Sequence, residues 1–279
     1  MARTVRGARI LITGAASGMG RLYAERAVLE GARSVILWDV DHDSLKEVTG
    51  VLTALADPGT SIHPYTVDLG ELGAIAQTAH KVRRLAGAPD IIINNAGIVR
   101  GALFWEHDNG DDTRKIMQVN ALAPMYLTRE FLPAMIDDAS RAKRIVNVAS
   151  AAGLLSNPRM SVYAASKWAL IGWSDSLRLE LEREGHSNVK VTTVAPSYID
   201  TGMFEGARGP LLTPVMKPDY VVDRVWDAML SGRPLLTLPR SVALAKALKG
   251  ILPVRAWDAI AGPVFGVYSS MDDFVGRAR

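Results

Sequence analysis

Short apolar runs alternate with longer stretches of helical periodicity along most of the chain. Apolar runs of strand length occupy residues 8–13, 34–39, 62–67, 90–94, 144–149, 189–195 and 234–238. Helical periodicity is found over residues 18–30, 43–55, 72–86, 112–136, 161–184 and 218–230. Strands that are nearly continuous in apolar residues are typical of parallel sheets that helices cover on both sides. The pattern therefore predicts an α/β fold with a doubly wound, seven-stranded parallel sheet and helices on both faces.

The chain is predicted to form one domain. Its 279 residues, 48% of them hydrophobic, could by length alone form one domain or two. No Gly/Ser-rich or Pro-rich linker divides the sequence. We therefore expect a single domain over residues 1–279. Within it, residues 240–279 should form a small helical C-terminal extension, whose two short helices are separated at Pro253.

Composition and charge exclude several classes of protein and site. The 32 Lys and Arg residues nearly balance the 29 Asp and Glu residues, and the absence of a long basic run argues against a nucleic-acid partner. With no cysteine and five scattered histidines, neither a disulfide nor a metal site is expected. The first apolar run ends at Gly14, too early for a signal peptide or a membrane span. A cytoplasmic location is the expectation.

A glycine-rich turn joins the first predicted strand to the first predicted helix. The segment TGAASGMG places glycines at positions 14, 18 and 20. Glycines permit a tight turn there and let backbone N–H groups approach a pyrophosphate, which the positive end of the helix stabilises. The alternative is an ordinary turn. The order of strand, turn and helix favours a Rossmann-type nucleotide site.

Asp39 ends the second predicted strand and selects between two cofactors. At this place a carboxylate can accept hydrogen bonds from both hydroxyl groups of an adenosine ribose. It would repel the 2'-phosphate of NADP, and neither Ser17 nor Val40 supplies a compensating cation. NAD is therefore the predicted cofactor. The alternative is that Asp39 caps the next helix, although Asp43 and Ser44 are better placed for that.

Three polar residues form a candidate catalytic group. Tyr163 and Lys167 are four residues apart in YAASK and would project from one face of a helix, while Ser150 ends a strand. An ammonium group and a positively charged nicotinamide would both lower the pKa of the Tyr163 phenol. The phenol could then exchange a proton with an alcohol whose oxygen Ser150 holds, while hydride moves to the nicotinamide. Taken singly, each of these residues is better explained as structural.

Together these motifs resemble the short-chain dehydrogenase/reductase superfamily. The resemblance rests on TGAASGMG, on NNAG at residues 94–97, on Ser150 and on YAASK, and it covers about the first 200 residues. It implies that Asn120 helps to hold a chain of water molecules that links Lys167 to solvent. Asn120 would thereby complete a catalytic tetrad with Ser150, Tyr163 and Lys167. Ser197 stands where many members of the family carry glycine.

The resemblance also implies the cofactor contacts. Asp68 would meet the adenine amino group, and Asn94 with Ala96 and Gly97 would line the adenosine ribose and steady the centre of the sheet. After the sixth strand, Pro196 and Thr201 would belong to the segment that holds the carboxamide. The expected cofactor site comprises Gly14, Ser17, Gly18, Met19, Gly20, Asp39, Asp68, Leu69, Asn95, Ala96, Gly97, Tyr163, Lys167, Pro196, Ile199 and Thr201.

A finer resemblance concerns the substrate. The segments PSYIDTGMF, VILWD and SSMDDFVGR are similar to the branch of the family that contains retinol and 17β-hydroxysteroid dehydrogenases. This implies a bulky, lipophilic secondary or allylic alcohol, or the corresponding ketone. Residues 197–217 are the expected substrate lid. The expected apolar pocket comprises Ala152, Leu154, Leu155, Met160, Met203 and Phe204, each of which could instead be ordinary core.

Several alternatives remain open from the sequence. The family commonly forms homodimers or homotetramers through helices that correspond to residues 112–136 and 161–184, so a homo-oligomer is expected. The C-terminal extension could touch a membrane surface, which is the weaker prediction. The chain could also be an NADPH-dependent ketone reductase. A third reading is a nucleotide-sensing binding protein that kept the fold without the chemistry.

Overall fold

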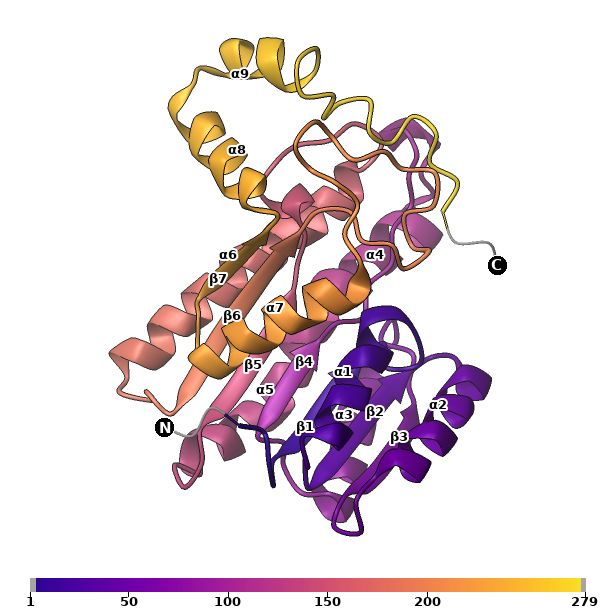
Figure 1. The fold of residues 1–279 in the computed structure, drawn as a ribbon, viewed down its shortest axis with the longest axis vertical. Helices are drawn as coiled ribbons and strands as arrows, with labels where there is room; N and C mark the ends of the chain where they lie inside the picture. The colour runs from indigo at the N-terminus through magenta and orange to yellow at the C-terminus, as the bar shows by residue number, and fades with distance from the viewer. Residues whose placement is uncertain (1–3, 277–279) are drawn as a thin grey trace.

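The computed structural model describes residues 4–276 and contains one parallel sheet (Figure 1). Its strands are β1 (Arg9–Thr13), β2 (Ser34–Asp39), β3 (Ser61–Thr66), β4 (Ile91–Asn94), β5 (Lys143–Val148), β6 (Val189–Pro196) and β7 (Leu235–Leu238). They lie in the order β3-β2-β1-β4-β5-β6-β7, and every pairing is parallel. The predicted seven-stranded doubly wound sheet is confirmed.

Helices cover both faces of the sheet. The α-helices of the described residues are α1 (Gly18–Leu29), α2 (His42–Leu55), α3 (Leu72–Leu85), α4 (Lys115–Met117), α5 (Ala123–Asp137), α6 (Ser161–Arg183), α7 (Pro218–Ser231), α8 (Arg240–Ile251) and α9 (Val254–Ala261), of which α1, α2 and α7 cover one face and α3, α5 and α6 the other. Ile10 and Ile12 of β1 point into a core shared with α1, α2 and α7, whereas Leu11 points into a core shared with α3, α5 and α6. This alternation along one strand explains why the strand sequences are apolar throughout.

The predicted helix over residues 112–136 is interrupted. Two π-helical turns, Asn109–Arg114 and Gln118–Leu122, flank the short α4 and precede α5. Pro124 has no N–H to donate to the carbonyl of Asn120, so the regular hydrogen-bond ladder fails at this point. In the same turn the Asn120 side chain pairs with Ile98, accepting from its N–H at 2.9 Å and donating to its carbonyl at 2.8 Å. These two bonds hold Asn120 against the segment after β4.

The C-terminal extension contains the two helices expected from the sequence. The helices α8 and α9 are separated at Leu252 and Pro253, and they form one end of the molecule, far from β3 and α2 (Figure 1). Within residues 4–276 no helix is both long and apolar enough to cross a bilayer.

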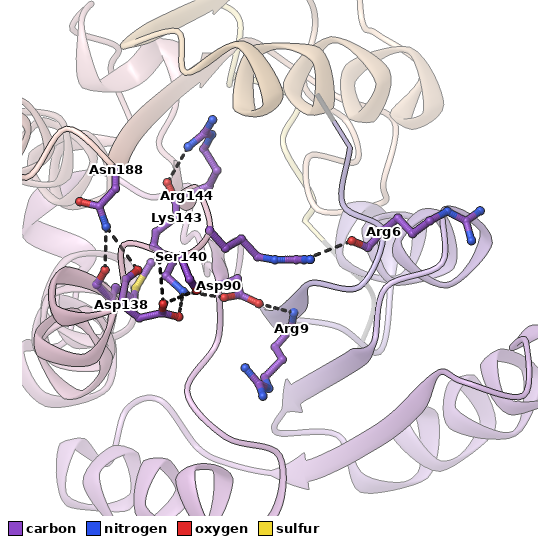
Figure 2. A network of polar contacts seen from close by, with 10 residues as sticks. Arg6, Arg9, Asp90, Asp138, Ser140, Lys143, Arg144 and Asn188 are labelled. Atoms are coloured by element: carbon purple, nitrogen blue, oxygen red, sulfur yellow. Dashed lines mark hydrogen bonds and ion pairs between the residues drawn. The ribbon is translucent and has the colours of Figure 1, made fainter. Parts of the chain in front are cut away.

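An ion network centred on the buried Lys143 connects neighbouring strands at their amino ends (Figure 2). Lys143 at the start of β5 donates to Asp90 at 2.7 Å and also pairs with Asp138 after α5. The other Asp90 oxygen accepts from the backbone N–H of Arg9 at 2.8 Å. The network therefore joins β1, β4 and β5 at the edge opposite to the carboxyl ends of the strands.

Candidate active site

The turn between β1 and α1 requires glycine for two different reasons. Gly14 has φ +65°, a left-handed conformation that side chains rarely adopt. Gly20 lies behind the turn, where an added Cβ would be only 1.8 Å from the Gly14 carbonyl oxygen. Gly14 and Gly18 line the cleft above the turn, but Gly20 does not. Gly20, which we predicted as a cofactor-site residue, therefore shapes the turn and does not line the cleft.

Asp39 ends β2 beside this turn and does not cap the next helix. Helix α2 begins at His42, and its cap is Asp41, which accepts from the Ser44 N–H at 3.0 Å. The capping alternative for Asp39 is thus wrong, as is the expectation that Asp43 or Ser44 caps this helix. The Asp39 carboxylate accepts from the N–H of Ala16 at 2.8 Å and lines the cleft. Among the described residues of the cleft, Lys115 and Lys167 are the only basic ones.

The cleft runs along the carboxyl ends of the central strands and has a volume of about 360 Å³. It is lined by most of the residues that we predicted: Gly14, Ser17, Gly18, Met19, Asp39, Asp68, Leu69, Asn95, Ala96, Gly97, Tyr163, Lys167, Pro196, Ile199 and Thr201. Ligands of doubly wound sheets bind at this edge. The sequence motifs therefore converge on one cavity.

Asn94 does not line the cleft. Its side chain is buried beneath the sheet edge, where it donates to Asn147 at 2.8 Å and to Thr128 at 3.3 Å. The next residue, Asn95, lines the cleft and donates to the Thr13 carbonyl at 3.0 Å. The Asn94 side chain therefore braces the centre of the sheet and does not reach the cleft as the ribose contact would require, because successive side chains of a strand point to opposite sides.

Sequence reasoning missed several lining residues: Val40, Val67, Ile98, Lys115, Val119, Val148, Ala149 and Ser197. Val40, Val67 and Ala149 directly follow strand ends, and this position is a signal that could have found them. Lys115 and Val119 are four residues apart and share one side of the helical segment. Their exposure to the cleft depends on the irregular turns between α4 and α5.

Tyr163, Lys167 and Ser150 lie together at the junction of α6 and β5. Tyr163 and Lys167 project from the same face of α6, and the Lys167 ammonium lies 5.7 Å from the centre of the Tyr163 ring. Lys167 Nζ donates to the carbonyl oxygen of Val148 at 3.0 Å. All three side chains are buried and line the same cleft. A substrate oxygen placed there could meet both hydroxyl groups.

Burial dominates the ionisation of this group. It raises the pKa of the Tyr163 phenol to about 12, against a smaller lowering by the hydrogen bond with Ser150. It lowers the pKa of the Lys167 ammonium to about 8. That Lys167 and a bound nicotinamide together lower the phenol pKa stays a prediction, because the raised value describes the side chains alone and is dominated by desolvation.

Asn120 is fully buried beside this group. It donates to Ser166 Oγ at 3.1 Å in addition to its two bonds with Ile98. A Cβ added at Gly97 would lie 3.3 Å from Asn120 Oδ1 and 3.4 Å from Lys167 Nζ. The four residues of the predicted tetrad are thus gathered around the backbone of Gly97 and the end of β5.

A second, apolar pocket of about 110 Å³ adjoins the cleft. Ser150 and Phe204 line both cavities, and Ala152, Leu155 and Met160 line the apolar pocket as predicted. Leu154 and Met203 do not: Leu154 packs with Val242 and Trp257, and Met203 faces the cleft. The outer wall is formed by residues that we did not predict, namely Val242, Leu244, Ala245, Leu248, Trp257, Phe265 and Val267.

Comparisons with known proteins agree with this geometry. The family model described as short chain dehydrogenase matches residues 8–210. Epidermal retinol dehydrogenase 2 of Mus musculus is 35% identical over 99% of this chain and 88% of its own length. Retinol dehydrogenase 10 of Homo sapiens is 34% identical over 91% of this chain and 81% of its own. A crystal structure of a short chain dehydrogenase/reductase from Burkholderia phymatum in complex with NAD is similar, with a TM-score of 0.79 and 25% identity over 90% of this chain and 95% of that one.

Proposed function

Because the chain belongs to the short-chain dehydrogenase family, we propose that it transfers a hydride between NAD and a secondary or allylic alcohol or the corresponding carbonyl compound. The observation that carries this proposal is the meeting of two cavities at Ser150, beside the buried pair Tyr163 and Lys167. A dinucleotide in the cleft and an apolar substrate in the pocket would present their reacting carbons to each other at this point.

The residues of the cleft fit a dinucleotide. The backbone at Gly14 and Gly18 is open toward the cleft at the N-terminus of α1, where pyrophosphate is stabilised. The Asp39 carboxylate, already held by the Ala16 N–H, is placed to accept from a ribose and to repel a 2'-phosphate. When bound, NAD would supply the hydride acceptor and a positive charge beside the phenol.

Tyr163 is the proposed acid and base of the reaction. In alcohol oxidation its phenol oxygen takes the hydroxyl proton, and in carbonyl reduction it returns that proton. Ser150 Oγ holds the substrate oxygen during either direction. Lys167, which donates to Val148, and Asn120, which is fixed on Ile98, are proposed to complete the tetrad and to pass the proton toward solvent.

The apolar pocket supports a bulky, lipophilic substrate. Its walls carry leucines 155, 244 and 248 and the aromatic residues Phe204 and Trp257. Such walls stabilise hydrocarbon by removing it from water and offer few partners to a carboxylate. The relatives that resemble this chain are named retinol dehydrogenases, and retinol is itself a bulky, lipophilic alcohol.

A panel of alcohols and ketones tests the proposal. The purified protein is given NAD(H) or NADP(H), and turnover is followed through the absorbance of the reduced nicotinamide. We expect turnover of large apolar alcohols with NAD, and kcat/KM at least about tenfold lower with NADP because of the like charge at Asp39. Preference for NADP would favour the alternative ketone reductase. Binding without turnover of any member would favour the nucleotide-sensing alternative.

A further inference from the structure

The end of the chain lies along the lid segment that follows β6. Residues 270–276, here called the C-terminal strap, run from the region of α9 across residues 204–208 (Figure 1). The Arg208 N–H donates to the Ser270 carbonyl at 2.9 Å, and the Val275 and Gly276 N–H groups donate to the Glu205 carbonyl at 2.9 and 3.2 Å. The two segments therefore share backbone hydrogen bonds and are not merely adjacent.

The close approach of these segments requires glycine at one position. Gly206 has φ +83°, and a Cβ added there would lie 2.0 Å from the Asp273 carbonyl oxygen. A side chain at this position would push the strap away from the lid. The local sequence thus permits a contact that most residues would prevent.

A buried polar cluster fastens the strap. The Asn157 amide donates to Tyr198 OH at 3.1 Å and to Ser270 Oγ at 2.9 Å, and these two hydroxyl groups are 2.9 Å apart. The three residues come from the loop after β5, the segment after β6 and the strap. Tyr198 and Ser270 are buried, so the loss of one partner leaves polar groups without water. We call this cluster the latch.

Aromatic contacts connect the latch to the catalytic tyrosine. The Phe204 ring makes edge contacts with the Tyr198 ring at 5.4 Å and with the Tyr163 ring at 5.9 Å between centroids. On its other side it contacts Phe274 of the strap at 6.4 Å. Met271 of the strap is 1% exposed and belongs to the same apolar cluster as Tyr163. Phe204 is also the aromatic residue that lines both cavities.

We propose that the C-terminal strap is a positioning element of the active site: the latch of Asn157, Tyr198 and Ser270 holds it closed and so fixes Phe204 against Tyr163, where the two cavities meet. The inference rests on the proposed function for its catalytic consequence. Its structural part, the closure of the strap by the latch, stands independently of turnover. Ser270 is a positioning residue, since it acts on Tyr163 through Phe204, whereas Asn157 and Tyr198 also line the apolar pocket.

Two single substitutions test the latch, with a neighbouring serine as control. Ser270→Ala and Tyr198→Phe each remove one hydroxyl group and keep the packing of the side chain. We expect each to lower kcat/KM for a bulky alcohol about fivefold, mainly through a higher KM, with the dissociation constant of NADH unchanged. Ser269→Ala removes an exposed hydroxyl group next to the latch and should leave both values unchanged.

The combination of both substitutions distinguishes a latch from two separate effects. Because the two hydroxyl groups form one cluster, the double variant should lose little more than either single variant. Additive losses, or an equal loss in Ser269→Ala, would overturn the proposal. So would a loss that appears entirely in NADH binding, since that would place the effect in the cleft and not at Phe204.

Hydrogen exchange gives a readout that does not depend on activity. The amides of Arg208, Val275 and Gly276 are protected by the strap contacts, and we expect their exchange to accelerate about fivefold in Ser270→Ala and Tyr198→Phe. Unchanged exchange in both variants would overturn the latch even if the enzyme is active. Faster exchange in a protein that turns over no alcohol would instead support the latch while the proposed function fails.

Discussion

Burial acts on Tyr163 and Lys167 in the same sense, favouring the uncharged form of each. It raises the phenol pKa to about 12 and lowers the ammonium pKa to about 8. At neutral pH the phenol therefore holds its proton, as the acid in carbonyl reduction must. In alcohol oxidation the same group must first lose that proton, so oxidation should depend on pH much more strongly than reduction.

We expect kcat/KM for alcohol oxidation to rise with pH and kcat/KM for carbonyl reduction to stay nearly constant, because the phenol remains almost fully protonated below its pKa of about 12. From about pH 6 to 9 the phenolate fraction increases about tenfold per pH unit while the pH stays below the phenol pKa. Steady-state rates in both directions over this range check the sign. An oxidation rate that does not change with pH would remove Tyr163 from the role of base.

Tyr163→Phe separates the chemistry from cofactor binding. The substitution deletes the phenol oxygen and keeps the ring that packs on Phe204. We expect kcat to fall at least about a hundredfold, the usual contribution of a positioned acid or base, with little change in NADH affinity. Single-turnover kinetics and NADH fluorescence titration measure the two quantities. Retained turnover would contradict the assignment.

Cofactor choice is also a property of one residue. Asp39→Asn keeps an oxygen for the Ala16 N–H but removes the charge that would repel a 2'-phosphate. We expect the ratio of NADP to NAD dissociation constants to fall about tenfold, as the loss of a like-charge contact implies. Asp43→Asn is the control, since Asp43 is exposed in the first turn of α2 and does not line the cleft. An equal effect of both substitutions would contradict a specific role for Asp39.

At the scale of elements, the sequence predicted the strands and helices that local periodicity determines. It did not predict the contacts between segments that are distant in the sequence. The strands and the glycine turn are local, and they were found. The break before α5 falls at Pro124, which the periodicity does not register, and the contact of Asn120 with Ile98 joins segments that are distant in the sequence. The outer pocket wall depends on α8 and α9, whose packing against residues 151–160 is fixed only by the complete fold.

The turn between β1 and α1 gives a sharp steric prediction. In Gly20→Ala the new Cβ would collide with the Gly14 carbonyl oxygen, so the turn or α1 must move. We expect NAD affinity to fall at least about tenfold and the free energy of unfolding to fall by about 1–3 kcal/mol. Gly50→Ala in α2 is the matched control: nothing lies within 4 Å of its added Cβ, and the helix should gain about 0.5–1 kcal/mol. Titration calorimetry and urea unfolding measure the two effects, and equal behaviour of the two variants would contradict the steric argument.

Across the whole molecule, the carboxyl ends and the amino ends of the parallel strands carry different features. The carboxyl ends of the strands carry the cleft and the predicted tetrad and lid, whereas the amino ends carry the ion network around Lys143 (Figure 2). The proposed homodimer or homotetramer, the cytoplasmic location and the weaker alternative of a membrane contact stay predictions. They concern surfaces and partners that neither motif spacing nor the contacts within one chain determine.

This separation predicts that stability and cofactor binding can be changed independently. Lys143→Met leaves the buried Asp90 without its cation, and the loss of one partner from a buried ion pair costs about 3–5 kcal/mol. NAD affinity should stay within about twofold of the original, because the network lies at the opposite edge of the sheet. Lys190→Met is the control: Lys190 is a lysine near the start of β6 and makes no ion pair within residues 4–276.

The destabilisation by Lys143→Met should depend on pH. The hydrogen bond from Lys143 to Asp138, helped by Ser140, holds the pKa of the Asp138 carboxyl well below its usual range. A carboxyl whose pKa is lowered by folding stabilises the fold above its unfolded pKa of about 3.9, and this contribution is lost as the pH falls toward the folded value. The difference between the original and Lys143→Met proteins should therefore be largest near neutral pH and shrink below about pH 4. Urea unfolding at several pH values measures it, and a difference that is constant with pH would show that the carboxylates do not stabilise the fold through Lys143.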